Sequence, residues 1–127
     1  MERIYMDKKL LVVDDSRVSR MMIISCVKAY DDSWTILEAA SSDEALKQVQ
    51  NHTFSAISLD INMPGRSGLD IVPELQALQP EMQIALLTAN IQKSVSAQAE
   101  KMGITFVPKP VTEDKVNNLM KQIEAAL

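Results

Sequence analysis

The feature of this sequence that most constrains its fold is a regular alternation between two patterns of apolar residues. Short continuous apolar runs lie at residues 10–13, 35–37, 56–59, 84–87 and 104–107, and longer segments with helical spacing separate them. A continuous run is typical of a strand buried on both faces, as in a parallel sheet covered by helices, and parallel neighbours require helical crossovers. The sequence therefore predicts one α/β domain with a doubly wound, five-stranded parallel sheet and five helices.

The segment after the first run predicts an amphipathic helix. Its apolar residues recur every three to four positions, which predicts one buried stripe. The members of that stripe are Val18, Met22, Cys26 and Ala29. Arg17 and Arg20, near the start of this helix, are interpreted as solvated charges.

Capping signals and breakers predict where the other helices begin and end. Ser41 has Glu44 three residues later, a capping box that opens a helix running to about residue 51. A third helix is predicted over about 70–78, and its Pro73 should bend it unless it lies in the first turn. A fourth over about 91–102 ends at Gly103, a natural left-handed cap. The last begins near residue 112.

Composition and charge exclude several classes of protein. The chain has 127 residues, with 13 basic and 17 acidic side chains and no run of Lys or Arg, which argues against direct nucleic-acid binding. No apolar stretch approaches the ~20 residues of a membrane span. A single cysteine, Cys26, and a start with charges of both signs predict a cytoplasmic protein. With no Gly/Ser/Pro-rich linker, residues 1–127 are expected to be one domain without a separate output domain, and residues 1–7 are a candidate loose tail.

Polar residues follow four of the five apolar runs. Asp14 and Asp15 follow the first run, Asp60 follows the third, Thr88 the fourth and Lys109 the fifth. Ligands of open α/β sheets bind outside the carboxyl ends of the strands, so these side chains are expected at one edge of the sheet.

The three carboxylates at this edge would repel one another, by ~1 kcal/mol for a pair 4 Å apart in water. A hard cation would offset that repulsion, and a site with oxygen ligands and room for water favours Mg²⁺ over Ca²⁺. Lys109 supplies an ammonium group and Thr88 a hydroxyl, which are groups that hold phosphoryl oxygens. The sequence therefore predicts a magnesium and phosphoryl site.

The same residues carry a resemblance to a known family. The pair Asp14-Asp15, the pattern Asp60…Met63-Pro64…Gly68, Thr88 and Lys109-Pro110 occur in order, each at a strand end. In this, the chain from about residue 8 to residue 127 resembles the receiver domain of two-component response regulators, specifically the single-domain, chemotaxis-type (CheY-like) members. The resemblance implies the flavodoxin-like strand order 2-1-3-4-5, of which CheY is itself a standard example.

The resemblance implies a role for each matching residue. Asp60 would be the phosphoacceptor, taking a phosphoryl group from a phosphohistidine or a small phosphodonor. Asp15, Asp60 and the backbone carbonyl of Asn62 would bind Mg²⁺, with Asp14 acting largely through bound water. Lys109 would pair with the phosphoryl group.

The resemblance also implies a switch. Thr88 would move to hydrogen-bond the phosphoryl group, and Phe106 would turn into the vacated space. The Lys109-Pro110 peptide bond is implied to be cis. Two positions depart from the chemotaxis pattern: Phe106 replaces the usual Tyr and has no hydroxyl, and Asn90 replaces a frequent Glu, which leaves the lifetime of the acyl phosphate open.

The partners implied are a sensor histidine kinase or phosphotransfer protein upstream and a protein target downstream, without nucleic acid or membrane. The target would bind the face made by the fourth helix, fifth strand and fifth helix, and the protein would be a monomer or a phosphorylation-dependent dimer. The protein would catalyse only its own phosphorylation and dephosphorylation. Two alternatives remain open: a haloacid-dehalogenase-like phosphatase, although Asn62 stands where its general acid would be, and a pseudo-receiver that binds partners without phosphorylation.

Overall fold

Strands and helices alternate along the whole described chain, as the apolar pattern predicts. The structure is a computed structural model that describes residues 8–127; the tail expected at residues 1–7 lies outside the described residues. The strands are β1 (Lys9–Val13), β2 (Thr35–Ala39), β3 (Ala56–Leu59), β4 (Gln83–Thr88) and β5 (Thr105–Pro108). The helices are α1 (Arg17–Tyr30), α2 (Ser42–Asn51), α3 (Gly68–Leu78), α4 (Lys93–Met102) and α5 (Glu113–Ala125).

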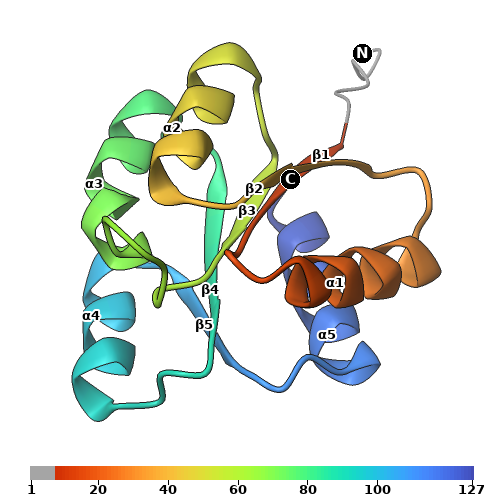
Figure 1. Cartoon of the computed structure of the whole chain (residues 1–127). Helices are drawn as coiled ribbons and strands as arrows, with labels where there is room; N and C mark the ends of the chain where they lie inside the picture. The colour runs from red at the N-terminus through yellow and green to blue at the C-terminus, as the bar shows by residue number, and fades with distance from the viewer. Residues whose placement is uncertain (1–7) are drawn as a thin grey trace.

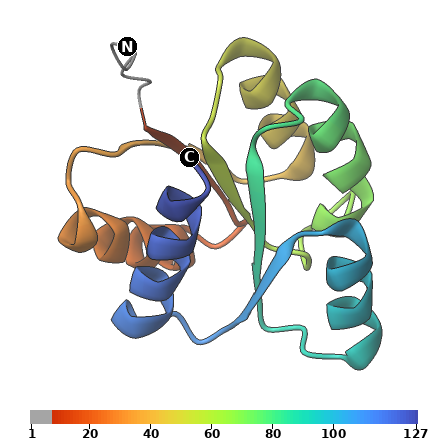
Figure 2. The same cartoon turned by 180° about the vertical axis from the view of Figure 1, so that it is seen from behind.

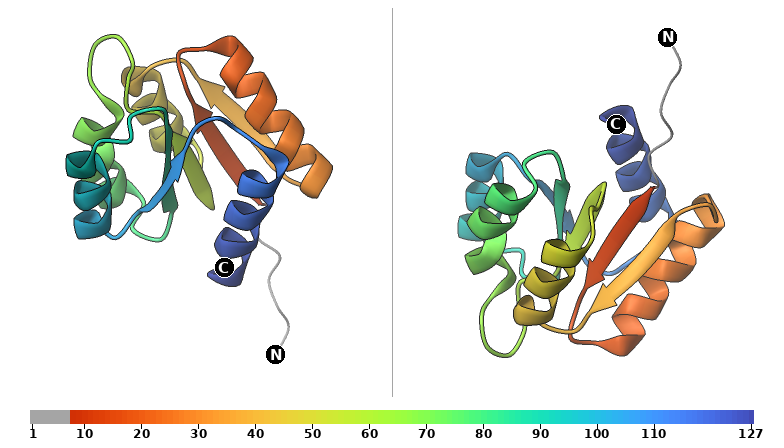
Figure 3. Two further views of the ribbon diagram at one scale, coloured as in Figure 1. Left: turned by 90° about the horizontal axis from the view of Figure 1, so that it is seen from below. Right: turned by 90° about the horizontal axis from the view of Figure 1, so that it is seen from above.

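The five strands form one parallel sheet between two layers of helices. The strand order is β2-β1-β3-β4-β5, which confirms the flavodoxin-like topology. α1 and α5 cover one face, and α2, α3 and α4 cover the other (Figures 1 and 2). Figure 3 shows the same three layers from the two ends of the molecule. A hydrophobic core lies on each face of the sheet, and alternate residues of β1 point into the two cores. Leu11 and Val13 pack on the α2–α4 side, and Leu10 and Val12 pack on the α1–α5 side.

The strands differ in burial according to their place in the sheet. The central strands β1, β3 and β4 are buried almost throughout. In β2 only Ala39 is buried, and all four residues of β5 are half-buried. The prediction that the runs at 35–37 and 104–107 are covered on both faces was therefore wrong. Each lies in an edge strand, which has one neighbouring strand instead of two.

The prediction of which side chains of α1 are buried was also wrong. Val18 is 66% exposed and Met22 47% exposed, Ala29 is exposed, and Cys26 is only half-buried. The side chains that α1 buries are Ile23 and Val27, which pack with α5 over β1 and β3. The helix carries apolar residues on more than one face, so spacing alone did not show which stripe meets the sheet.

The helix ends follow the predicted signals closely. The Ser41 hydroxyl oxygen accepts a hydrogen bond from the Glu44 N–H, which confirms Ser41 as the N-cap. The Glu44 carboxylate reaches back to the Ser41 hydroxyl at 3.3 Å, in place of the Ser41 backbone N–H that a full capping box uses. Gly103 ends α4 with φ of 70°. α3 begins two residues earlier than predicted, so Pro73 is its sixth residue and lies beyond the first turn. α5 begins at Glu113 with Thr112 as its N-cap, close to the predicted start near residue 112. Over residues 8–127, no helix is both long and apolar enough to cross a membrane.

Candidate functional site

The predicted site residues meet at the carboxyl edge of the sheet, where β1 and β3 lie side by side. Val13 pairs with Leu59 in the sheet register. The hydrogen-bond ladder continues one residue further, since the Asp60 N–H donates to the Val13 carbonyl at 3.0 Å. Asp14 and Asp60 therefore leave the sheet next to each other. Connections from β1 and β3 cover opposite faces of the sheet, which makes this edge the switch point where such folds bind ligands.

Asp14, Asp15 and Asp60 form an acidic cluster at this edge. One carboxylate oxygen from each can be chosen so that the three lie within 4.8 Å of one another. Asp14 is fully buried, Asp60 is 6% exposed and Asp15 is open to solvent. Two desolvated carboxylates beside a third are unfavourable unless cations compensate for them. An all-oxygen donor set with one solvent-facing member fits a hard divalent cation that keeps bound water.

Lys109 supplies one compensating cation. Its Nζ donates to Asp14 Oδ2 at 2.7 Å and to Asp60 Oδ2 at 3.4 Å, and it lies 3.5 Å from Ser19 Oγ. Burial by itself lowers the pKa of Lys109, but the hydrogen bond to Asp14 and the charge of Asp60 outweigh burial and raise that pKa above its ordinary value. The group is therefore an ammonium ion at neutral pH.

The backbone around Lys109 is also fixed. Its N–H donates to the Thr88 carbonyl at 2.8 Å, which ties the end of β5 to the end of β4. The Lys109-Pro110 peptide bond is cis.

The loop after β3 wraps closely around the Asp60 carboxylate. Asp60 Oδ1 accepts the N–H of Ile61 at 2.7 Å and lies 3.4 Å from the N of Asn62. Asn62 itself is exposed. Gly68 explains how the chain returns so tightly, because a Cβ at this position would lie 2.1 Å from the Asp60 carbonyl oxygen. A glycine is therefore required on steric grounds at the point where α3 begins against the strand end.

Thr88 and Phe106 occupy neighbouring strands beside the acidic cluster. Thr88 is fully buried, and its Oγ1 accepts the N–H of Asn90 at 3.1 Å. Phe106 pairs with Leu86 in the register, two residues before the level of Thr88. Its ring is half-buried against the α2–α4 core. Phe106 is thus half-buried because it lies on an edge strand of the sheet.

The structure adds two residues that the sequence did not indicate. Arg20, interpreted above as a solvated charge, donates from Nη1 to the Asp14 carbonyl oxygen at 2.6 Å and from Nε to Glu38 Oε1 at 2.8 Å. Glu38 lies on β2 and pairs with Val12 of β1, two residues before Asp14, so it meets the cluster through Arg20. No local motif joins residues 20 and 38, so only the strand pairing could have revealed this contact.

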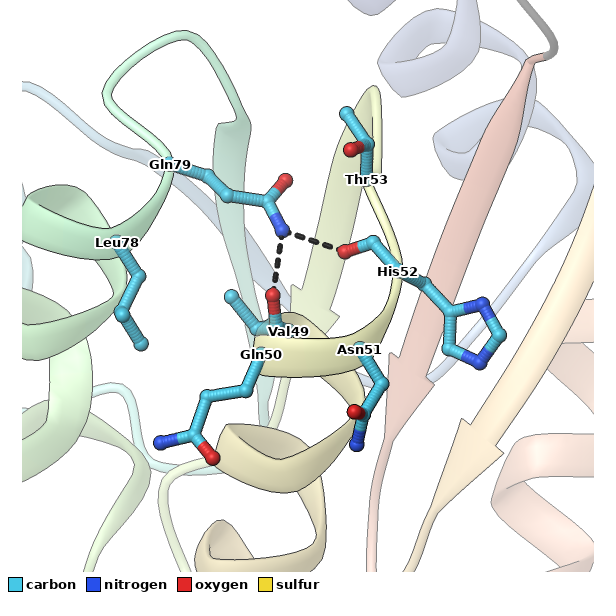
Figure 4. Close-up of a pocket in the computed structure, with 7 residues that line it drawn as sticks. All are labelled: Val49, Gln50, Asn51, His52, Thr53, Leu78 and Gln79. Carbon is cyan, nitrogen blue, oxygen red and sulfur yellow. Dashed lines mark hydrogen bonds between the residues drawn. The ribbon is translucent and has the colours of Figure 1, made fainter.

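A hollow lies at the edge of the sheet opposite the acidic cluster and carries no comparable chemistry. It has a volume of about 250 Å³ and is lined by residues where α2 and α3 end (Figure 4). Gln79 spans it, donating to the carbonyls of Val49 at 2.8 Å and His52 at 2.6 Å and accepting the Phe54 N–H at 2.9 Å. The hydrogen bonds of the Gln79 amide thus link the end of α3 to the end of α2.

Comparisons with known proteins identify the family of the chain. The family model of the response regulator receiver domain matches residues 10–121. The chemotaxis protein CheY of Listeria monocytogenes is 33% identical over 109 residues, which cover 85% of this chain and 91% of the relative.

Solved structures show the same fold. The chemotaxis protein CheY4 of Vibrio cholerae is 27% identical with a TM-score of 0.79, over 94% of this chain and 98% of that chain. A response regulator from Burkholderia pseudomallei, solved with a phosphorylated aspartic acid, a calcium ion and citrate, is 28% identical with a TM-score of 0.78, over 94% and 74% of the two chains. The chain therefore belongs to the response regulator receiver domain family of two-component signalling.

Proposed function

We propose that this receiver domain is a chemotaxis-type switch that accepts a phosphoryl group on Asp60 from a histidine kinase or phosphotransfer protein. The observation that carries the proposal is the convergence of three carboxylates with Lys109, whose Nζ lies 3.4 Å from Asp60 Oδ2. A carboxylate is a competent nucleophile for this transfer. The Asp60 oxygen forms a bond to phosphorus as the bond from phosphorus to the donor's histidine nitrogen, or to acetate in acetyl phosphate, breaks.

The donor set fits Mg²⁺ held by Asp15, Asp60 and the Asn62 carbonyl, with Asp14 acting through bound water. The ion would neutralise charge between the nucleophile and the phosphoryl oxygens. The protein's own part is to hold the Asp60 carboxylate in place through the Ile61 N–H and to present the Lys109 ammonium to the incoming phosphoryl oxygens. The chain catalyses only its own phosphorylation and dephosphorylation in this proposal.

The output of the switch is a protein contact on the face made by α4, β5 and α5. Thr88 leaves the Asn90 N–H to hydrogen-bond the phosphoryl group, and Phe106 turns into the space beside it. Because Phe106 has no hydroxyl, its inward position fills space without adding a hydrogen bond. The activated protein is a monomer or a dimer that forms on phosphorylation.

The experiment is phosphorylation by acetyl phosphate with Mg²⁺, followed by intact-mass measurement. The wild-type chain should gain the mass of one phosphoryl group, and hydroxylamine should remove it, because an acyl phosphate is cleaved by that nucleophile. Asp60→Asn should gain none. Asp70→Asn, an exposed acid in the first turn of α3, is the matched control and should be labelled like the wild type.

Two results would overturn the proposal. A label that persists in Asp60→Asn would place the acceptor elsewhere, and a wild-type chain that gains no label would support the pseudo-receiver alternative. The phosphatase alternative has no structural observation in its favour, since Asn62 is an exposed amide and the described residues supply no second acid at that place.

A further inference from the structure

The side chain of Arg20 joins two elements at the acidic cluster. It is only 14% exposed, although it is the fourth residue of α1, and Arg17, the first residue of the helix, is exposed. One nitrogen, Nη1, donates to the Asp14 carbonyl at 2.6 Å, and a second, Nε, donates to Glu38 Oε1 at 2.8 Å. The guanidinium thus links α1, the end of β1 and β2. The two donors are separate nitrogens held apart on one rigid plane, an arrangement that the single nitrogen of a lysine does not reproduce.

Together with its neighbours, Arg20 fixes the polar atoms of Asp14. Oδ1 accepts the Ser16 N–H at 2.9 Å, Oδ2 accepts Lys109 Nζ at 2.7 Å, and the carbonyl accepts Arg20. The backbone N–H of Arg20 also donates to the Ser16 carbonyl at 3.0 Å, so hydrogen bonds hold the short connection from Asp14 to α1 at both ends. Asp15 lies within that connection, so the held backbone fixes the point from which its exposed side chain starts.

We propose that Arg20 is a positioning residue for the cation site, oriented by Glu38, and that it acts by holding Asp15 toward Asp60. The inference rests on the proposed function, because it assigns the metal to the acidic cluster. Loss of the Arg20 charge and loss of the Arg20 hydrogen bonds should have opposite effects on Mg²⁺ affinity. A cation beside three carboxylates repels Mg²⁺, so loss of its charge alone would tighten Mg²⁺ binding. Loss of its hydrogen bonds would loosen the loop and weaken binding.

The test measures the Mg²⁺ dissociation constant by isothermal titration calorimetry on the metal-free protein. Arg20→Met should bind Mg²⁺ roughly 10-fold more weakly than the wild type, the size typical of residues that orient metal ligands. Arg20→Lys should show a similar loss although it keeps the charge, because one nitrogen replaces two donors that the guanidinium holds apart on a rigid plane. Arg17→Met, which removes an exposed charge from the same helix, is the control and should bind like the wild type.

Glu38 provides an independent arm that leaves α1 untouched. Glu38→Gln keeps an oxygen that can accept from Arg20 Nε and should bind Mg²⁺ within about twofold of the wild type, whereas Glu38→Ala should show the same loss as Arg20→Lys. Far-ultraviolet circular dichroism of each metal-free variant reports whether it is folded. If Arg20→Met does not fold, Arg20→Lys and Glu38→Ala decide the question.

The outcomes separate the two proposals. Tighter or unchanged Mg²⁺ binding in Arg20→Met, with a wild type that binds Mg²⁺ and is phosphorylated on Asp60, overturns the role of Arg20 alone. A wild type that shows no Mg²⁺ binding overturns the proposed function and this inference together. Weaker binding in Arg20→Met, Arg20→Lys and Glu38→Ala, with Arg17→Met unchanged, supports the inference.

Discussion

Two buried serines show how much one hydroxyl group matters in this interior. Ser42 is 2% exposed and its Oγ donates to the Arg66 carbonyl at 2.8 Å. Ser58 on β3 is 3% exposed, and its Oγ is the buried side-chain atom without a hydrogen-bond partner among the described residues. A buried hydroxyl that lacks a partner loses its hydration without compensation. Burial of the Ser58 hydroxyl is therefore less favourable than burial of the Ser42 hydroxyl, although the two side chains are about equally buried.

Alanine substitution at the two serines should have opposite effects on stability. Ser58→Ala removes an unsatisfied hydroxyl and should raise the free energy of unfolding by about 1 kcal/mol. Ser42→Ala leaves the Arg66 carbonyl without a donor and should lower it by about 1 kcal/mol. Urea denaturation measures both. An equal loss in Ser58→Ala would show that its hydroxyl has a partner, such as a buried water molecule.

At the level of single residues, the sequence was informative where polar residues follow the end of a strand closely. An apolar run ends one or two residues before each of five such residues, and the parallel topology then brings them to one edge: Asp14, Asp15, Asp60, Thr88 and Lys109. Arg20 and Glu38 could not be found in this way. Their contact depends on the register of β2 against β1, which no pattern within either segment encodes.

At the level of elements, α1 is the clearest example of an ambiguous pattern. Its apolar residues occupy two stripes, and the spacing of Val18 and Met22 is as helical as that of Ile23 and Val27. Which stripe is buried depends on how α1 meets the sheet and α5, and that is a property of the assembled fold. Helices with a clear signal at their ends, such as α2 with its capping box, were placed correctly.

Substitutions in the two stripes of α1 should therefore differ in their cost. Ile23→Ala deletes a side chain that is 3% exposed and should lower the free energy of unfolding by roughly 2–5 kcal/mol. Val18→Ala removes a side chain that is 66% exposed and should change it by less than about 0.5 kcal/mol. Thermal or urea unfolding of both variants tests this. Equal losses would contradict the burial of one stripe only.

At the level of the whole molecule, a polar network at the edge opposite the acidic cluster joins the start of β1 to the ends of α1 and α5. Lys8 Nζ lies 3.2 Å from Asp31 Oδ2 and 3.3 Å from Glu124 Oε2. Glu124 also accepts the hydroxyl of Tyr30 at 2.7 Å and the indole N–H of Trp34 at 3.3 Å. These hydrogen bonds, that from Tyr30 first, hold the pKa of Glu124 below its ordinary value.

The lowered pKa of Glu124 predicts a loss of stability in acid. A carboxyl group with a depressed folded-state pKa stabilises the fold above its unfolded value, about 4.5, and that contribution is lost as the pH falls through the folded-state value. Glu124→Gln should therefore flatten the fall of the melting temperature below about pH 4.5. Glu81→Gln, an exposed acid, is the control and should leave the acid profile unchanged. A Glu124→Gln profile that matches the wild type would contradict this role for the network.

The hydrogen bonds of Lys109 couple residues that follow three different strands of the sheet. A single ammonium on the connection after the last strand reaches two acids at the ends of the first and third strands, so those acids share it. A phosphoryl group on Asp60, as proposed, would draw this ammonium toward itself and weaken its contact with Asp14. One side chain would thus carry the effect of the added charge from the third strand to the first and to the connection that follows the fifth.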